Sequence, residues 1–126
     1  MVIKETLFKG KKIDELRKMS LQELALLLPS DSRRKLRKLT DAEKKFMEKI
    51  EKAKKPVKTH YRSMLILPFM VGKTILVHDG HTYPMVIITE DMIGHRLGEF
   101  SMTRRKVSHS APGIGATKSS SSLSVK

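Results

Sequence analysis

Two histidines, His78 and His81, flank an Asp79-Gly80 pair and are the residues best spaced to hold a metal ion. A structural zinc site needs four ligands with supporting hydrogen bonds, and no further ligand follows at a recognisable spacing. Cysteine is absent from the chain. We therefore expect no metal, and we interpret both histidines as turn residues that face solvent or phosphate. A metal-dependent hydrolase built on His78, Asp79 and His81 stays as an alternative that metal analysis would test.

Acid–base catalysis would require two carboxylates, or a histidine beside a carboxylate, in a pocket. Between residues 60 and 107 the acidic residues are Asp79, Glu90, Asp91 and Glu99. The first is typical of a turn and the next two are typical of the start of a helix, which leaves Glu99 without a partner. The glycines also lack the strand-to-helix context of a phosphate-binding loop. We expect a protein that is not an enzyme and that uses no cofactor.

Positive charge is the main chemical feature of the 126 residues. Lys and Arg number 26 against 13 Asp and Glu, a formal net charge of +13. Twelve of the basic residues lie between Arg33 and Lys58, and Arg104, Arg105 and Lys106 form a second cluster. Such an excess neutralises phosphates, and the release of counterions makes binding steeply dependent on salt. Because aromatic residues are too few for a single-strand stacking surface, the expected partner is folded RNA or DNA, contacted through its backbone and shape.

Membrane insertion and secretion are both excluded by hydropathy. The mean hydropathy is −0.33, and no apolar run approaches the roughly 18 to 20 residues that a membrane span needs. Residues 1–10 contain Lys4, Glu5 and Lys9 and lack the apolar centre of a signal peptide. We expect a cytosolic protein with no membrane partner.

The first half of the chain carries two helix-start patterns. Ser20 with Glu23, and Thr40 with Glu43, have the spacing of capping boxes, in which side chains and backbone N–H groups bond reciprocally. Leucines at helical spacing follow the first pattern, and a narrow apolar stripe on a lysine-rich segment follows the second. A proline ends each segment. Residues 1–59 are therefore predicted to form a basic helical extension.

From residue 60 onward the pattern changes to short strands and turns. Residues 69–71 predict one helical turn, and residues 74–77 and 85–89 predict two strands. The Asp79-Gly80 pair between the strands predicts a tight hairpin, because glycine accepts a positive φ. This hairpin is the centre of the expected compact domain, residues 60–107.

Two further elements are predicted after the hairpin. Thr89, followed by two carboxylates, predicts the start of a helix that continues through Leu97 and ends at Gly98. Residues 101–107 predict an edge strand, and residues 108–126, with no acidic residue, predict an extended, flexible basic tail. The expected fold class is α+β: a small antiparallel sheet packed with short helices, preceded by the basic helical arm and followed by the tail.

Several stretches together resemble the signature of the universal small-subunit ribosomal protein nineteen family, known in eukaryotes as small-subunit protein fifteen. They are Asp79-Gly80-His81, Ile88, the run IGHRLGEF at residues 93–100, Thr103, the basic run Lys52-Ala53-Lys54-Lys55, Lys58-Thr59-His60, Ile66-Leu67-Pro68 and Met70-Val71-Gly72. The run HSAPGIGATKSS at residues 109–120 looks like the archaeal and eukaryotic branch. The resemblance extends from Lys9 to Ser120.

The resemblance implies a structural constituent of the small ribosomal subunit in the cytoplasm. It implies an α+β domain on the head, bound to the 3′ domain of the small-subunit rRNA beside ribosomal protein thirteen, near a contact with the large subunit. It also implies a tail that extends toward tRNA in the decoding region, with His109, Gly113, Gly115 and Lys118 in the tail motif. The alternative is a non-ribosomal basic architectural protein that binds DNA or RNA.

The residues expected to contact rRNA combine the basic clusters with the histidines. They are Lys52, Lys54, Lys55, Lys58, His60, Arg62, Lys73, His78, His81, His95, Arg96, Arg104, Arg105 and Lys106. Gly94 and Gly98 are interpreted either as allowing close approach of the helix backbone to RNA or as ordinary packing and a helix end. Arg96 between them is expected to project toward a phosphate.

Overall fold

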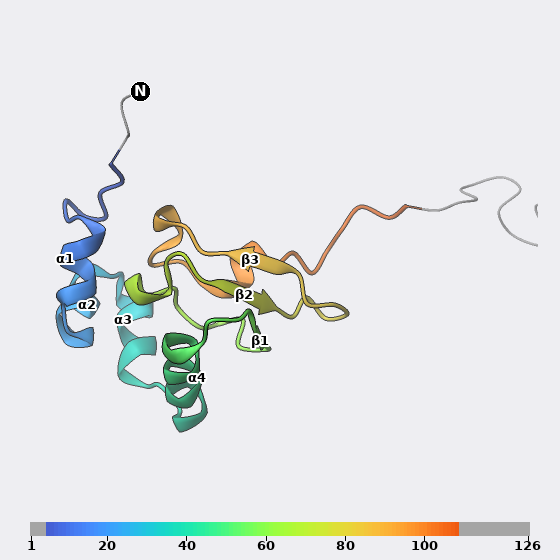
Figure 1. The fold of residues 1–126 in the computed structure, drawn as a ribbon, viewed down its shortest axis with the longest axis horizontal. Helices are drawn as coiled ribbons and strands as arrows, with labels where there is room; N and C mark the ends of the chain where they lie inside the picture. Colours follow the sequence, from blue (N-terminus) through green and yellow to red (C-terminus); the bar gives the residue numbers. More distant parts are fainter. Residues whose placement is uncertain (1–4, 109–126) are drawn as a thin grey trace, which may run out of the picture.

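The computed structural model describes residues 5–108, which fold into four helices and a three-stranded sheet with short 3-10 turns (Figure 1). The helices lie on one side of the molecule and the sheet on the other, and the chain beyond the sheet leads away from the helices. Within the described residues, no helix is long and apolar enough to span a bilayer. The expected α+β class is confirmed.

The two capping boxes form as predicted. Helix α2, Leu21–Leu27, begins after Ser20, and helix α4, Asp41–Lys52, begins after Thr40. In each box the hydroxyl accepts from the N–H of the glutamate three residues later at 3.3 Å, and the glutamate accepts from the N–H of the capping residue at 2.9 Å. These reciprocal bonds satisfy N–H groups that a helix start otherwise leaves unpaired.

Two shorter helices within the predicted helical extension lack such start signals. Helix α1 comprises Ile13–Lys18, and helix α3 comprises Ser30–Arg37. Pro29, expected only to end α2, also stands at the N-cap of α3, where its lack of an N–H costs nothing and its fixed φ suits a helix start. The α3 sequence, SDSRRKLR, is almost wholly polar, so its orientation depends on its neighbours.

The sheet is mixed rather than purely antiparallel, which corrects one part of the prediction. Strands β2, Thr74–Val77, and β3, Met85–Ile87, form the predicted antiparallel hairpin. Its tip is a turn closed by the Asp79 N–H to the Thr82 carbonyl at 3.0 Å, with Gly80 at φ +102°. Strand β1, Val57–Thr59, was not predicted and pairs in parallel with β2 on its other edge.

The predicted helix from Thr89 to Leu97 is wrong. Two 3-10 turns, η2 at Glu90–Met92 and η3 at Leu97–Phe100, replace it, and Gly98 lies inside the second turn. Gly94, at φ +85°, reverses the chain between them. The reversed segment exchanges backbone bonds with Ile66, whose N–H donates to the His95 carbonyl at 2.8 Å and whose carbonyl accepts from the Gly94 N–H at 3.1 Å. This tertiary pairing outweighs the local helix pattern.

The predicted edge strand at residues 101–107 is also wrong. Ser101 is buried, but residues 102–108 are exposed and form no strand. Met102 and Val107 are 69% and 71% exposed, so the segment has no apolar face to place against the sheet.

One hydrophobic core joins the helices to the sheet. The run of residues 64–67 is almost wholly inaccessible, each at 1% exposure or less. The 3-10 turn η1, Pro68–Met70, confirms the predicted helical turn and lies against both α1 and α4. Leu16, Leu24, Phe46 and Ile50 from the helices enter the same buried cluster as Ile75 and Val77 from the sheet. The basic helices are therefore held in fixed positions beside the sheet.

Candidate nucleic-acid interface

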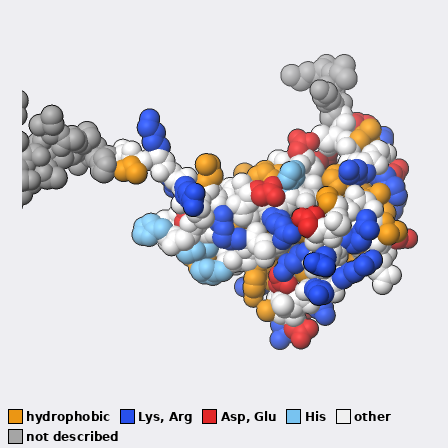
Figure 2. All heavy atoms as spheres, turned by 180° about the vertical axis from the view of Figure 1, so that it is seen from behind, with side chains coloured by type: hydrophobic (Ala, Val, Ile, Leu, Met, Phe, Trp, Pro, Cys, Tyr) orange, Lys and Arg blue, Asp and Glu red, His pale blue; other side chains and the backbone are white. Residues whose placement is uncertain are grey.

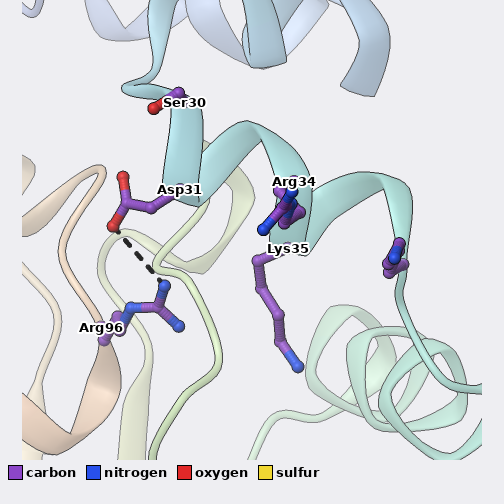
Figure 3. A pocket seen from close by; sticks show the side chains of 6 residues that line it. Ser30, Asp31, Arg34, Lys35 and Arg96 are labelled. Atoms are coloured by element: carbon purple, nitrogen blue, oxygen red, sulfur yellow. Dashed lines mark ion pairs between the residues drawn. The ribbon is translucent and has the colours of Figure 1, made fainter.

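A basic hollow of about 700 Å³ opens on the surface beside α3 (Figure 3). Its lining comes from two distant parts of the chain and consists of Ser30, Asp31, Arg34, Lys35, Lys38 and Arg96. Four of these six residues are cations. Arg96 stands on one side and the α3 side chains Arg34 and Lys35 on the other, with Asp31 reaching toward Arg96.

The cations of α3 differ in what they contact. Arg34 and Lys38, one helical turn apart, are exposed, and no carboxylate in the described part of the chain forms a salt bridge with either. Lys35, in contrast, places its Nζ 2.5 Å from Glu43 Oε1. Arg34 on α3 and Lys38 directly after it are thus free to meet a phosphate, whereas Lys35 is tied to α4.

Glu43 is the fixed point of that tie. Its side chain is only 5% exposed and accepts hydrogen bonds from Lys35 and from the N–H and hydroxyl of Thr40. Burial acts most strongly and raises the pKa of Glu43, but the hydrogen bonds from Lys35 and Thr40 together outweigh burial, and the net effect is a lowered pKa. The carboxylate therefore stays charged and holds α3 against the start of α4.

Arg96 forms the opposite wall of the hollow. Its Nη1 donates to the Ser63 carbonyl at 3.0 Å, and its Nη2 lies 3.7 Å from Asp31 Oδ2. The side chain is 32% exposed. The sequence predicts that Arg96 projects from a helix toward a phosphate. The structure instead places its guanidinium between the Ser63 carbonyl and Asp31, at the edge of the hollow.

Two other cations that were expected to contact RNA direct their donors inward. Arg62 donates to three backbone carbonyls, those of His78 at 2.5 Å, Gly98 at 2.8 Å and Ser101 at 2.6 Å. Lys73 donates through Nζ to the carbonyls of Ile50 at 2.5 Å and Glu51 at 2.7 Å, at the end of α4. A cation there gives the Glu51 carbonyl a donor, adds a second donor to the Ile50 carbonyl, which also accepts from the Ala53 N–H at 3.3 Å, and interacts favourably with the helix dipole.

The two signature glycines make close contacts within the protein. A Cβ on Gly98 would lie 3.0 Å from both the Cβ and the carbonyl oxygen of Arg62. A Cβ on Gly94 would lie 3.3 Å from the side chains of Leu28 and Phe8. Of the two interpretations of these glycines, the structure therefore favours packing over approach to RNA.

At the other end of the molecule, the sheet brings several predicted residues together. His60 and His78 directly follow the paired ends of β1 and β2, and their ring centroids lie 4.3 Å apart. The Tyr83 ring stands edge-on to both, and its hydroxyl is 2.6 Å from His60 Nε2. Lys58 Nζ lies 5.1 Å from the centre of the Tyr83 ring. Figure 2 shows histidine side chains gathered at this end, away from the lysines and arginines of the helices.

The turn beside this cluster is held by Asp79. Its carboxylate accepts from the Thr82 N–H at 2.7 Å and the His81 N–H at 2.9 Å, and it pairs with Arg105 at 2.9 Å. These contacts, the Thr82 N–H first, hold the pKa of Asp79 at about 2. Within residues 5–108, no group of three histidine, aspartate or glutamate side chains is placed to hold a metal ion.

The remaining predicted contact residues lie on the surface. Lys52, Lys54, Lys55, His81, His95, Arg104, Arg105 and Lys106 are exposed. Within this set, His95 bonds to Glu99 at 2.7 Å, and Arg105 pairs with Asp79. The tail residues His109, Gly113, Gly115 and Lys118 lie outside the described residues. Sequence reasoning missed Arg34 and Lys38 as individual site residues, although both belong to the densest basic stretch.

Residues 34–109 match the family model described as ribosomal protein S19. The chain belongs to the ribosomal protein S19 family. A relative from the archaeon Thermoplasma acidophilum, described as small ribosomal subunit protein uS19, is 48% identical over 124 residues, which is 98% of this chain and 82% of that protein. The resemblance to the archaeal and eukaryotic branch is thereby confirmed.

Membership of the S19 family confirms the broad functional prediction. The chain is a structural component of the small ribosomal subunit in the cytoplasm, with rRNA as its partner. The family consists of structural ribosomal proteins, which generally are not enzymes.

Proposed function

We propose that this S19-family chain binds the 3′ domain of the small-subunit rRNA in the head of the subunit through two sets of cations. One set lines the hollow between α3 and Arg96. The other consists of the exposed lysines after α4 and the cluster Arg104–Lys106. The observation that carries the proposal is the hollow, because Arg34 on the docked helix α3 and Lys38 at the C-cap of that helix have no carboxylate partner among the described residues.

The physical argument for rRNA rests on the cost of gathering like charges. Cations that face one another across an open hollow repel, and a phosphate placed between them removes the repulsion and releases counterions. Folded RNA presents phosphates at such density along its grooves. The protein then acts by attachment and shape, with no catalytic step.

The finer contacts implied by the family resemblance belong to the same proposal. The compact domain, residues 60–107, lies beside ribosomal protein thirteen and near the large subunit, and the tail, residues 108–126, extends toward tRNA in the decoding region. The helical extension, residues 1–59, supplies most of the hollow. Support for this division is the family signature together with the uneven distribution of charge along the chain.

Sedimentation of a cell lysate through a gradient at about 0.5 M salt tests the attachment. Non-specific phosphate binding is largely lost at that salt, so co-migration with the small subunit is expected only for a specific component. Release of the protein to the top fractions would contradict the proposal and would favour a loosely bound basic protein.

Deleting residues 108–126 tests the role of the tail. The truncated chain is expected to enter small subunits nearly as well as the full chain, because the folded part precedes the deletion, while tRNA-dependent steps of translation slow down. Failure of the truncated chain to enter subunits would show that the tail is needed for attachment itself.

A further inference from the structure

The geometry points to a nucleobase-binding site at the end of the sheet, where the ring of His60, backed by His78, stacks an unpaired base of the rRNA. This inference rests on the proposed binding of rRNA and adds a different kind of contact to it. A phosphate contact reads only the backbone, whereas stacking engages the face of a base that is free of its helix.

The parallel pairing of β1 with β2 creates the site. Thr59 is the register partner of Val77, and the His78 N–H donates to the Thr59 carbonyl at 2.9 Å. The residue directly after each strand is a histidine, His60 after β1 and His78 after β2, so the two imidazoles stand side by side at the ends of neighbouring strands. Their ring centroids lie 4.3 Å apart and the ring planes are tilted by 36°, so the two imidazoles are in contact.

Hydrogen bonds and a cation hold these rings in place. The Val77 N–H donates to the Pro84 carbonyl at 3.2 Å, and this bond places the neighbouring Tyr83 beside the end of β2. The Tyr83 hydroxyl then bonds to His60 Nε2 at 2.6 Å. The Gly80 N–H donates to His78 Nδ1 at 3.1 Å. Since these hydrogen bonds already hold both imidazoles in place, binding a base costs little additional side-chain entropy.

The cluster also has an open side and nearby positive charge. His60 and Lys58 are exposed, while His78 and Tyr83 are half-buried. The His60 ring contacts His78 on one face and meets the Tyr83 ring edge-on. Because His60 is exposed, we assign the base to the face of the ring turned away from His78. Lys58, over the Tyr83 ring, and Arg105, paired with Asp79 directly after His78, are the cations near the cluster that can meet the phosphates flanking a stacked base. Unpaired rRNA supplies both a base and its flanking phosphates.

Two substitutions of His60 test the stacking. With the full-length chain and a transcript of the 3′ domain of the small-subunit rRNA as probe, His60→Ala is expected to weaken binding roughly 5- to 150-fold, the range found when an aromatic platform for one base is removed. His60→Phe keeps a flat ring and is expected to bind within about threefold of the wild type. Neither change alters the slope of log affinity against log salt, because no phosphate contact is lost.

A matched phosphate-contact variant separates this proposal from the proposed function. Arg34→Ala is expected to lower the salt slope by about 0.9. If the wild type fails to bind the transcript with steep salt dependence, both proposals fall. If the wild type binds and His60→Ala binds equally well, only the stacking is overturned. Stacking is also overturned if His60→Phe is as weak as His60→Ala, whatever the salt slope, because a ring alone then does not suffice.

Discussion

Two regions of the molecule use positive side chains in opposite ways: the hollow beside α3, and the junction where Arg62 meets the carbonyls of His78, Gly98 and Ser101. In the hollow, Arg34 and Lys38 are exposed and find no carboxylate among the described residues. At the junction, Arg62 gives its donors to three backbone carbonyls from different segments of the chain. The two regions show that a cation in a basic protein is free to bind phosphate only when the fold has not already used its donors.

The consequence is a division of the net charge into two parts. Cations such as Arg62 and Lys73 bond to backbone carbonyls of distant segments: Arg62 to carbonyls around η3, and Lys73 to carbonyls at the end of α4. Cations such as Arg34 and Lys38 contribute nothing of this kind and are available to a partner. Substitutions in the two regions should therefore change different measured quantities.

The largest effect is expected for Arg62→Ala. The substitution removes three charged hydrogen bonds, to the carbonyls of His78, Gly98 and Ser101, and we expect the free energy of unfolding to fall by about 3 kcal/mol. Urea unfolding of the full chain measures it, with Arg34→Ala as the control that stays within about 0.5 kcal/mol of the wild type. The comparison breaks if Arg62→Ala is fully stable and instead lowers the salt slope of rRNA binding.

An intermediate effect, on affinity alone, is expected for the double variant Arg34→Ala/Lys38→Ala. Each lost phosphate contact lowers the slope of log affinity against log salt by about 0.9, so the slope should fall by about 1.8. Binding of the variant to rRNA across a series of salt concentrations gives the slope, and urea unfolding should be unchanged. A lower stability with an unchanged slope would place these residues with Arg62 instead.

The smallest effect is expected at acidic pH and concerns Asp79. The pKa of its carboxyl is about 2 in the folded chain against an ordinary 3.8, so the unfolded chain binds the proton more readily. The stabilisation is complete above about pH 4 and is lost as the pH falls toward 2. Asp79→Asn should flatten this part of the pH dependence, as measured by urea unfolding between pH 5 and about 2.5.

A control for this pH effect is Asp91→Asn, because Asp91 is exposed and accepts no side-chain hydrogen bond in the described structure. This variant should lose stability with falling pH as the wild type does. If Asp79→Asn and the wild type change in parallel, the turn of residues 79–82 does not depend on the charge of Asp79.

Local sequence patterns were sufficient to predict an element where the contacts that stabilise it join residues close together in the sequence. The capping boxes at Ser20 and Thr40 and the turn around Gly80 formed as predicted because their bonds join residues two or three positions apart. The α+β class and the S19 family followed from such patterns and from the signature run. The net charge likewise indicated a polyanionic partner without any knowledge of the fold.

Contacts between residues far apart in the sequence decided the features of the fold and of the candidate site that local patterns did not predict. The helix predicted after Thr89 gave way to two 3-10 turns because residues 94–95 pair with Ile66, a partner that no local pattern indicates. The hollow unites α3 with Arg96, and Arg62 bonds to carbonyls as far away as Ser101. The residue type determines whether a side chain carries a positive charge, but the packing of the whole chain determines where the N–H donors of that side chain point. Which cations remain free for rRNA is therefore a property of the fold.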